Sequence, residues 1–560
     1  MILGIFAWRT GNAQDQGAGA LVIQGGTLID GTGAPARPIK GIVIVGNRIR
    51  EIVPAQGILQ APPGARVVSA DGLTILPGLF DAHVHYRGFD GELYLAYGVT
   101  SVLDLGNVSE WIVAQQEGEA KGKIFGPRIF HSGGILIGED PAIHSYSMEP
   151  KNVEEAALAA QKSISVGANV IKIHELMTPP QIKAVAEVGR RAGINVIGHL
   201  GRFTDAREAA EAEINAIAHV SGVETALAKS QKGRSMSEGT SSKFDDSDIA
   251  ALAKFMVDKH VIMEPDLVVS GKGVYKQSAE FAAERVELLS DAHLGYIWPS
   301  ARDRWLYETG YGNATKRNAF TPATQADEAK YKENSRKEYE LEEKFLKAFV
   351  AAGGELLAGT DSQHFVMPGM GLQQEMQLLV ENVGISPMEA IKAATINPAR
   401  FVHHDKDLGT VEPGKLADII FVQGDPLQNI HNLRNIRTVI KNGTPVDTSF
   451  HSWYQNPIPR PTRETGGTNP VPIVTSISTT IATERDKETI VTIKGSRFAP
   501  GCIVTVNGRS VPIISGNRNE LTVRLQSQDL VQVGTLPVVV FNPAPEGGYS
   551  EPRYFIVKFR

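Results

Sequence analysis

The nine residues PGLFDAHVH, at positions 77–85, decide how the rest of the chain is interpreted. Their apolar character predicts a buried β-strand that ends at His85. Side chains two positions apart lie on the same face of a strand, so His83 and His85 present two imidazoles together. Two such nitrogens at a strand end suit Zn²⁺ or a similar divalent ion. An H-x-H sequence by itself is also compatible with a structural or incidental role, so the surrounding pattern has to decide.

Outward from this strand, apolar strand-like runs alternate with helical patterns, which is typical of parallel βα units with buried strands. Eight strands are predicted, at residues 79–85, 99–105, 128–131, 170–174, 195–199, 216–220, 261–267 and 355–361. This number predicts an α/β protein with a distorted (β/α)8 TIM barrel, whose functional site lies at the C-terminal strand ends. The charged stretch before residue 355 carries Leu341, Phe345 and Phe349 at i, i+4 and i+8, which predicts an amphipathic helix.

The flanks of the barrel are rich in short β-type runs. Such runs fill residues 20–68 and return at 417–422 and 438–443, so the two flanks are predicted to build one β-sandwich. Residues 473–558 hold about seven further runs, which predict an appended all-β, immunoglobulin-like sandwich. The predicted domains are a tail or signal remnant at 1–19, the composite sandwich at 20–77 and 408–447, the barrel at 78–407, a proline-rich linker at 448–472 and the C-terminal sandwich at 473–560.

Composition excludes several classes of protein. The 560 residues are 42% hydrophobic and carry 56 basic and 62 acidic side chains, for a net charge of −6, which excludes a disordered chain and a strongly basic nucleic-acid-binding protein. No run of 18 apolar residues occurs, so no transmembrane helix is predicted. The single cysteine, Cys502, excludes an internal disulfide and a multi-cysteine metal site, which leaves the 14 histidines as candidate ligands.

The N-terminal residues are ambiguous. Residues 2–8 form a short apolar stretch and residues 11–14 are similar to a cleavage region, but a basic segment before them is missing. A shortened secretion signal and a disordered tail are both compatible with this pattern.

PGLFDAHVH resembles the first-strand motif of the amidohydrolase superfamily. The metal site of that family uses strands one, four, five, six and eight, and this sequence is similar at each place, with Lys172 in VIKI, His199 in IGH, His219 in IAH and Asp361 in AGTD. The resemblance covers about residues 20–447, and GTVEPGKLAD at 409–418 is similar to the point where such proteins return to their β-rich flank. Agreement at five places is far more specific than any single motif.

Each of these side chains also has a physical argument and a simpler alternative. Lys172 lies in an apolar run where burial favours its neutral amine, which reacts with CO₂ to form a carbamate; the alternative is a lysine that extends its ammonium to solvent. His199 and His219 end successive strands, and the alternative is a pair of hydrogen-bonded core histidines. Asp361 ends an apolar strand where an unpaired carboxylate is destabilising, and the alternative is an ordinary helix N-cap.

The resemblance implies a role for each residue. His83, His85 and Asp361 would hold the more buried of two divalent ions, taken as Zn²⁺, and His199 and His219 would hold the more exposed one. Carboxylated Lys172 and a hydroxide would bridge the two ions. Asp361 would take the proton from this hydroxide as it attacks an amide carbonyl, and would pass it to the leaving nitrogen.

GANVIK at 167–172 resembles the imidazolonepropionase-like and Xaa-Pro dipeptidase-like branch of the superfamily, whose members cleave dipeptides, acylated amino acids and cyclic amides. The resemblance implies a metal-dependent hydrolase of amide bonds that acts on a small molecule or short peptide. Six residues near the presumed strand ends are candidate substrate-binding groups, although an exposed loop position explains each equally well: Tyr86, Arg128, His131, His144, Ser221 and His364.

The C-terminal segment has a resemblance of its own. PIVTSI at 472–477, TIKGSRF at 492–498, VTVNG at 504–508 and FNPAPEGGYS at 541–550 are similar to an IPT/TIG immunoglobulin-like domain. Such modules accompany extracellular and surface proteins, which favours a periplasmic or secreted protein over a cytoplasmic one. The module is expected to contact protein or polysaccharide, no nucleic-acid partner is expected, and the sequence is compatible with a homo-oligomer.

Two other hypotheses stay open. A mononuclear deaminase or cyclic-amide hydrolase would use the same scaffold with uncarboxylated Lys172 and one tightly bound ion. A binding protein would keep the barrel as an inactive scaffold and attach to a polymer or protein through its C-terminal module. The presence of all six metal-type residues argues against this loss of activity.

Overall fold

The structure is a computed structural model, and it describes residues 19–138, 147–201, 203–230, 244–270, 292–293, 325–362, 366–451, 456–458, 471–499, 501–542 and 548–560, without the side chains of 325–332 and 335. The N-terminal residues for which a signal or tail was considered lie outside these ranges. Among the described helices, none combines the length and the apolar character that a membrane span requires.

Parallel strands form the centre of the molecule. One sheet contains β7 (Leu79–Val84), β8 (Val99–Asp104) and β9 (Arg128–His131). A second contains β12 (Val170–Ile173), β13 (Asn195–Gly198), β14 (Ala216–Ala218) and β15 (Ile262–Glu264), with the short strands β10 (Ile135–Leu136) and β11 (Ser147–Met148) at its edge. These seven longer strands coincide with the first seven predicted ones to within a few residues.

The eighth predicted strand closes the barrel between β15 and β7. Leu357 N donates to the carbonyl of Met263 in β15 (2.9 Å), and Ala82 N of β7 donates to the carbonyl of Ala358 (3.0 Å). Residues 355–362 therefore bridge the two sheets, although only isolated bridges connect them to their neighbours instead of a regular ladder. The predicted fold class, a distorted barrel with strand-rich flanks and an all-β C-terminal domain, is confirmed.

Alternate residues of the barrel strands face an apolar interior. The intervening residues of the same strands, such as Ile129 and Ile171, point outward and belong to a second apolar cluster beneath the helices. Because side chains two positions apart share a face, Lys172, His199 and Asp361 continue the interior face towards the C-terminal strand ends. Seven of the eight strands contribute to the interior cluster, with Phe80, Leu103, Phe130, Val170, Ile197, Ala216 and Leu357. The barrel is thus filled with apolar side chains below a layer of ligand-type side chains.

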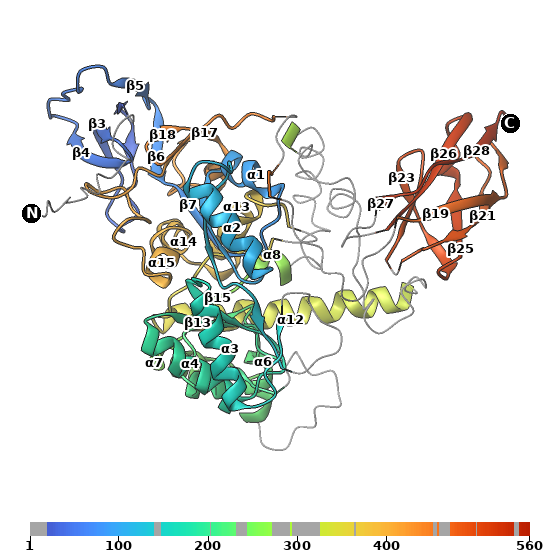
Figure 1. Cartoon of the computed structure of the whole chain (residues 1–560), viewed down its shortest axis with the longest axis horizontal. Coiled ribbons are helices and arrows are strands. Elements are labelled where there is room, and N and C mark those ends of the chain that lie inside the picture. The colour runs from blue at the N-terminus through green and yellow to red at the C-terminus, as the bar shows by residue number, and fades with distance from the viewer. Residues whose placement is uncertain are drawn as a thin grey trace, which may run out of the picture.

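Helices surround the barrel (Figure 1). Those described are α1 (Asp90–Ala96), α2 (Ser109–Ala120), α3 (Val153–Ser165), α4 (Pro179–Ala192), α5 (Ala206–Glu211), α6 (Val223–Ser230), α7 (Asp246–Asp258), α8 (Leu267–Ser270), α12 (Gln325–Ala351), α13 (Met370–Leu378), α14 (Pro387–Ala393) and α15 (Ile396–Phe401). The long α12 is the predicted amphipathic helix, with Leu341, Phe345 and Phe349 buried and Lys344 and Lys347 exposed.

The two flanks of the barrel meet in one nine-stranded sheet. Its N-terminal strands are β1 (Ala20–Gln24), β2 (Thr27–Leu28), β3 (Arg37–Val45), β4 (Arg48–Pro54), β5 (Arg66–Ser69) and β6 (Leu73–Pro77), and its late strands are β16 (Ile419–Gln423), β17 (Ile436–Lys441) and β18 (Thr444–Pro445). β16 runs antiparallel to β6, with Ile419 opposite Pro77 and Gln423 opposite Leu73. Figure 1 shows the blue and orange strands side by side. Since β7 follows β6 after one residue, this sheet holds the start of the metal-type strand.

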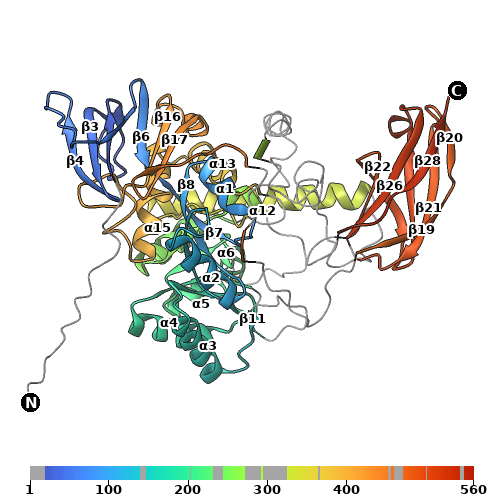
Figure 2. The same cartoon turned by 45° about the horizontal axis from the view of Figure 1, so that its top comes forward.

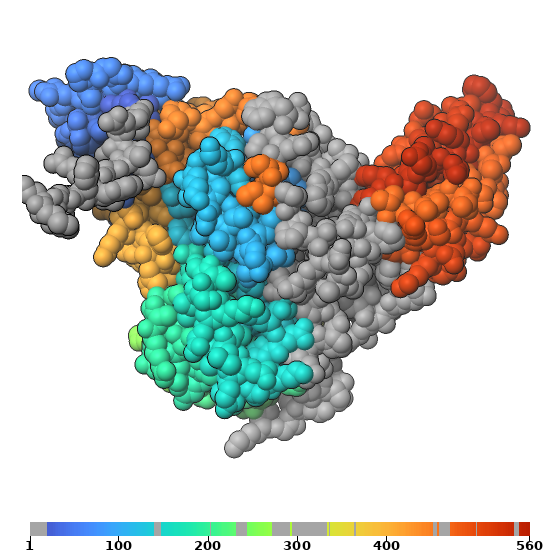
Figure 3. All heavy atoms as spheres, viewed as in Figure 1, coloured from blue at the N-terminus to red at the C-terminus, as the bar shows by residue number. Residues whose placement is uncertain are grey.

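The C-terminal domain consists of two antiparallel-rich sheets. One contains β19 (Ile473–Ser478), β21 (Glu488–Ser496), β25 (Glu520–Gln526) and β24 (Ile513–Gly516). The other contains β20 (Ile481–Thr483), β28 (Arg553–Lys558), β26 (Gly534–Asn542), β22 (Ile503–Val506) and β23 (Arg509–Val511), with β27 (Gly548–Tyr549) on β26. Val491, Leu521, Val538 and Phe555 lie in the core between them. In Figures 2 and 3 this sandwich is a separate lobe at the far end of the molecule from the blue N-terminal strands.

The start of the predicted proline-rich linker lies against the barrel. His451 Nδ1 is 3.1 Å from Glu92 Oε1 of α1, Asn456 Nδ2 donates to Gln115 Oε1 of α2 (2.7 Å), and the indole of Trp111 donates to the carbonyl of Ile458 (3.0 Å). The described parts of residues 447–458 therefore belong structurally to the barrel. The domain boundaries predicted from the sequence remain a proposal.

Candidate metal centre

β7 turns both histidines of PGLFDAHVH to the interior because its pairing with β8 is irregular. Phe80 belongs to the interior cluster, whereas Val84, an even number of positions later, belongs to the outer cluster. The register between the strands shifts between residues 81 and 84. A β-bulge changes the direction of side chains in this way. His83 and His85, which flank Val84, consequently face the interior.

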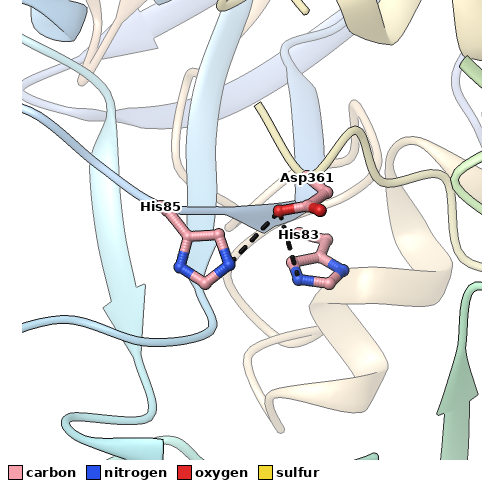
Figure 4. A group of neighbouring side chains, drawn as sticks. All are labelled: His83, His85 and Asp361. Carbon is pink, nitrogen blue, oxygen red and sulfur yellow. Dashed lines mark ion pairs between the residues drawn. The ribbon is translucent and has the colours of Figure 1, made fainter. Parts of the chain in front are cut away.

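His83, His85 and Asp361 form one group of ligand-type side chains in the site (Figure 4). Asp361 Oδ1 lies 3.2 Å from His85 Nε2 and 3.9 Å from His83 Nε2. The other nitrogen of His85, Nδ1, is 2.9 Å from the carbonyl oxygen of Gly106. Because a carbonyl only accepts, this contact places the His85 proton on Nδ1 and leaves the Nε2 lone pair directed at Asp361. The ring is thus held in the tautomer that a metal ligand needs.

Asp361 is ionised in this environment. Burial alone would raise its pKa, but a hydrogen bond from His85, which forms when that ring is protonated on both nitrogens, lowers it. The positive charges that His83, His85 and His219 can carry lower the pKa further, well below its usual value. Its backbone has φ of 42°, and the backbones of His219 and Asp266 have φ of 60° and 52°. Positive φ is uncommon for residues other than glycine and recurs at functional sites, where the surrounding structure maintains it.

Lys172 lies at the centre of the group. Its side chain is 1% exposed, and Nζ is 3.5 Å from His83 Nε2. Burial lowers the pKa of Lys172, and the nearby carboxylates of Glu264, Asp361 and Asp266 only partly offset this. A lowered pKa increases the share of neutral amine, which is the form that reacts with CO₂.

His219 and His199 extend the group towards solvent. The ring of His219 lies 5.0 Å from that of His83 and 4.5 Å from that of His199. Side-chain exposure rises from 1% for His83 to 17% for His219 and 28% for His199, so the row of imidazoles leads from the interior to the surface. Burial, followed by the charges of His219 and His174, lowers the pKa of His199 well below its usual value. His199 is therefore neutral at pH 7, as metal binding requires.

Two carboxylates that the sequence analysis did not select complete the site. Glu264 Oε2 lies 2.8 Å and Asp266 Oδ2 lies 2.9 Å from His83 Nδ1, and Asp266 Oδ2 lies 3.0 Å from His219 Nδ1. A signal for them existed, because both fall within the predicted apolar strand 261–267, where a buried carboxylate requires a partner. His174 and Glu175 were also missed. They lie beside His199, with the two imidazole rings 4.7 Å apart and Glu175 Oε1 3.8 Å from His199 Nε2.

Two of the predicted substrate-binding residues, Tyr86 and His131, lie on the outer side of the barrel strands. Tyr86 is fully buried and its ring packs 6.2 Å from those of Tyr94 and Trp111 in the outer cluster. His131 is fully buried and shares the strand face of Ile129, which also belongs to the outer cluster. Both residues therefore lie outside the barrel interior.

Arg128 and Ser221 have contacts of a structural kind. Arg128 is the first residue of β9, at the end opposite the site, and its guanidinium lies 3.3 Å from Asp418 Oδ2 and 2.6 Å from Asn442 Oδ1 of the flanking sheet. We therefore assign Arg128 to the attachment of that sheet instead of to substrate binding. Ser221 Oγ donates to the carbonyl of Ala218 (2.7 Å) and accepts from the N–H of Leu200 (2.8 Å). His144 and His364 lie outside the described residues.

The donor set fits divalent metal ions. Three groups each bring their ligand atoms within 4.8 Å of one another, namely His83, His85 and Asp361; His83, His219 and Asp266; and His174, Glu175 and His199. Imidazole and carboxylate are the ligands of catalytic zinc sites. Glu264 Oε1 and Asp266 Oδ1 are buried without a hydrogen-bond partner among the described residues. A bound cation would compensate for these buried oxygen atoms that lack a hydrogen-bond partner.

Comparison with known proteins agrees with this geometry. The model of the amidohydrolase family matches residues 94–446, more than half of the chain, and the model of the IPT/TIG domain matches residues 472–555. These matches confirm both resemblances found in the sequence and the predicted hydrolase of amide bonds.

Individual relatives are distant. Ochratoxinase of Aspergillus niger is 22% identical over 472 residues, which cover 73% of this chain and 82% of that protein. An imidazolonepropionase of Geobacillus sp. is 32% identical over 108 residues, or 19% of this chain and 26% of that protein. A solved structure of a putative prolidase from Bifidobacterium longum superimposes with a TM-score of 0.58 at 22% identity and covers 79% of this chain and 96% of that one. From its motifs, its barrel and the family match, the chain belongs to the amidohydrolase family and carries a C-terminal IPT/TIG domain.

Proposed function

We propose that this protein is a binuclear metal-dependent amidohydrolase that cleaves the amide bond of a dipeptide or an N-acyl amino acid. The observation that carries the proposal is the position of buried Lys172 beside His83, within a layer that also holds His85, His219 and Asp361. A buried amine whose pKa is lowered by desolvation, among imidazole and carboxylate donors, is the arrangement that a bridging carbamate requires. The likeness to a prolidase and to ochratoxinase supports the substrate class.

The two ions would use different side chains. His83, His85 and Asp361 would hold the inner ion, His199 and His219 the outer one, and carboxylated Lys172 would contact both. The increase in exposure from His83 to His199 supports this division into an inner and an outer position. When bound, two such cations lower the pKa of a water molecule and polarise the carbonyl of the scissile amide.

Asp361 would carry the proton during hydrolysis. Its lowered pKa keeps it ionised, so it is available to accept a proton from the attacking water. It would then deliver that proton to the amide nitrogen, because an amine leaves far more readily than an amide anion.

Metal content with and without Lys172 tests the mechanism. We expect two zinc or comparable ions per wild-type chain, and uptake of these ions by the apoprotein should increase with added bicarbonate, which supplies the CO₂ for the carbamate. The Lys172→Ala variant should lose at least one ion and lower kcat/KM by 100-fold or more, on the order expected when a metal ligand is removed.

Lys254→Ala is a matched control, because Lys254 is 69% exposed and pairs only with Asp258 of its own helix among the described residues. This variant should keep both ions and full activity. Wild-type protein with only trace metal, or Lys172→Ala protein that retains both ions and its activity, would refute the binuclear mechanism. A panel of dipeptides, N-acyl amino acids and lactams then separates the substrate classes.

A second candidate is a mononuclear hydrolase of cyclic amides or a deaminase. The match to an imidazolonepropionase, although it covers only 19% of this chain, supports it. One tightly bound ion, an unmodified Lys172 by mass spectrometry of the intact protein, and a preference for ring amides would favour this candidate. The opposite results favour dipeptide or N-acyl amino-acid hydrolysis.

We also propose that the protein is exported and that its IPT/TIG domain attaches it to a protein or polysaccharide. The family match of residues 472–555 supports the presence of such a module. Cell fractionation with an antibody to the native protein would test the location, and recovery in the cytoplasmic fraction alone would contradict it.

A further inference from the structure

One carboxylate at the end of β15 contacts both halves of the candidate metal centre. Asp266 is fully buried, and its Oδ2 atom lies 2.9 Å from Nδ1 of His83 and 3.0 Å from Nδ1 of His219. The two imidazoles come from different strands, β7 and β14, and their rings are 5.0 Å apart. A single oxygen therefore receives a hydrogen bond from a ring on each side.

These contacts determine which nitrogen of each ring is available. An ionised carboxylate only accepts hydrogen bonds, so both Nδ1 atoms must carry their protons. The Nε2 atom of each ring then keeps its lone pair and can bind a metal ion. Histidine ligands in metalloproteins are commonly held in this way, with the second nitrogen bound to a carboxylate or carbonyl.

Glu264 differs from Asp266 in the number of imidazole rings that its carboxyl group contacts. Its Oε2 lies 2.8 Å from His83 Nδ1, but among the described residues it makes no ion pair with His219. The two acids thus share one imidazole, and only Asp266 contacts the second. This difference provides a matched pair of equally buried carboxyl side chains, one in contact with a single imidazole and one in contact with two.

We propose that Asp266 is a positioning residue for both metal ions, because it orients His83 for the inner ion and His219 for the outer one. The inference rests on the proposed function in one respect, namely the assignment of these two histidines to different ions. Loss of the Asp266 charge should therefore lower the affinity of the protein for both ions. Removal of the Glu264 carboxyl group should lower the affinity only for the ion that His83 binds, because its contact is with that imidazole.

Titration of the apoproteins with Zn²⁺ against a competing chelator tests this inference without measuring activity. Asp266→Asn keeps the size of the side chain and should weaken both binding steps by about 10- to 100-fold, as expected for loss of a carboxylate behind a ligating histidine. Glu264→Gln should weaken one step only. His85→Ala and His199→Ala identify the two steps, because each removes a donor to one ion.

A further variant separates positioning from direct contact. If Asp266 acts on the outer ion through His219, Asp266→Asn should have no added effect on that step in the His219→Gln background. An undiminished effect in that background would overturn the positioning role, as would an Asp266→Asn variant in which one or both steps match the wild type.

The failure of the proposed function gives a different result. Wild-type protein with two binding steps and no hydrolysis of any amide in the panel would refute the function and leave the role of Asp266 intact. Wild-type protein with a single step would refute the binuclear site and the role of Asp266 together. Should Asp266→Asn not fold, ¹⁵N-histidine spectra of the wild-type apoprotein decide the question: Nδ1-protonated rings for His83 and His219 support the inference, and Nε2-protonated rings overturn it.

Discussion

His83 and His131 show how burial lowers the pKa of a histidine side chain. Both are almost fully buried, and desolvation lowers the pKa of each to about 4; for His83 the charge of Lys172 contributes as well. Both rings are therefore neutral in the folded chain at pH 7, whereas in the unfolded chain they titrate near pH 6.5. Between pH 6.5 and pH 4 the unfolded chain binds protons that the folded chain does not. The stability contributed by these two groups is accordingly lost as the pH falls through this window.

His131 allows this effect to be measured away from the metal ligands. Neither of its ring nitrogens has a hydrogen-bond partner among the described residues, so a leucine of similar size should be tolerated. In urea unfolding of the apoprotein between pH 6.5 and pH 4, His131→Leu should flatten the decline in the free energy of unfolding by about 1.4 kcal/mol per pH unit. Between pH 7.5 and pH 9 the two proteins should show the same slope. Parallel curves over the acidic range would contradict the prediction.

At this scale the sequence predicts some site residues and not others. The six metal-type residues could be selected because the motifs that contain them resemble those of the amidohydrolase superfamily at five barrel strands. Glu264 and Asp266 also lie in an apolar run, which indicates that each needs a partner. The sequence does not identify that partner, since His83 lies 181 and 183 positions away and no local pattern indicates which imidazole a carboxylate will face. Arg128 was a candidate substrate-binding residue because it lies near a presumed strand end. The structure places it at the first residue of β9, and strand direction separates it from the ligands.

At the scale of elements, regular strands are predictable and their irregularities are not. Seven barrel strands follow from apolar runs, and α12 follows from the spacing of Leu341, Phe345 and Phe349. The bulge in β7 turns His83 and His85 to the barrel interior. This bulge depends on the pairing with β8, which cannot be inferred from the periodicity of the sequence. The same holds for residues 447–458, where prolines predicted a linker but hydrogen bonds to α1 and α2 hold the described part on the barrel.

The stability that His451 contributes by attaching residues 447–458 to the barrel should depend on pH in the opposite sense to the stability contributed by His131. Burial works to lower the pKa of His451, but its hydrogen bonds to Asp447 and Glu92 outweigh this and raise it. A raised pKa in the folded state gives stability that is fully present below pH 6.5 and is lost as the pH rises through that higher pKa. His451→Gln should therefore lower the Tm of the barrel at pH 6, and the difference from the wild type should disappear at pH 8.5.

Asn456→Ala is the control for this prediction. It removes the hydrogen bonds between Asn456 and Gln115, which involve no titratable group. Its effect on Tm should be the same at pH 6 and at pH 8.5. A His451→Gln effect that is equally independent of pH would show that the segment is held by packing and neutral hydrogen bonds.

At the scale of the whole molecule, the apolar cores are divided between two units. The core of the C-terminal domain contains only residues between 474 and 557, and the barrel and flanking-sheet clusters contain none of them. The sandwich is a distinct lobe in Figures 1 and 2. Two units with separate cores are expected to unfold in separate transitions.

Metal removal should therefore affect one transition and spare the other. An ion that binds only the folded barrel stabilises it by about 4 kcal/mol at a free concentration of 1,000 times Kd, and chelation removes this contribution. Calorimetry of the full chain should show a barrel transition that falls by several degrees after chelation and returns with Zn²⁺, together with a C-terminal transition that does not move. A parallel shift of both transitions would indicate that the two units unfold as one.

The pairing of β6 with β16 also limits how early this protein can fold during its synthesis. Pro77 can pair with Ile419 only after about 340 further residues have been synthesised. At a translation rate of about 5–20 residues per second, this takes roughly 17–70 s. During that time the apolar edge of the nascent N-terminal strands has no partner, while β7 already carries both of its histidines. The barrel can be anchored at its first strand only after about three-quarters of the chain has been synthesised, so the nascent chain should depend on chaperones that shield an unpaired strand edge.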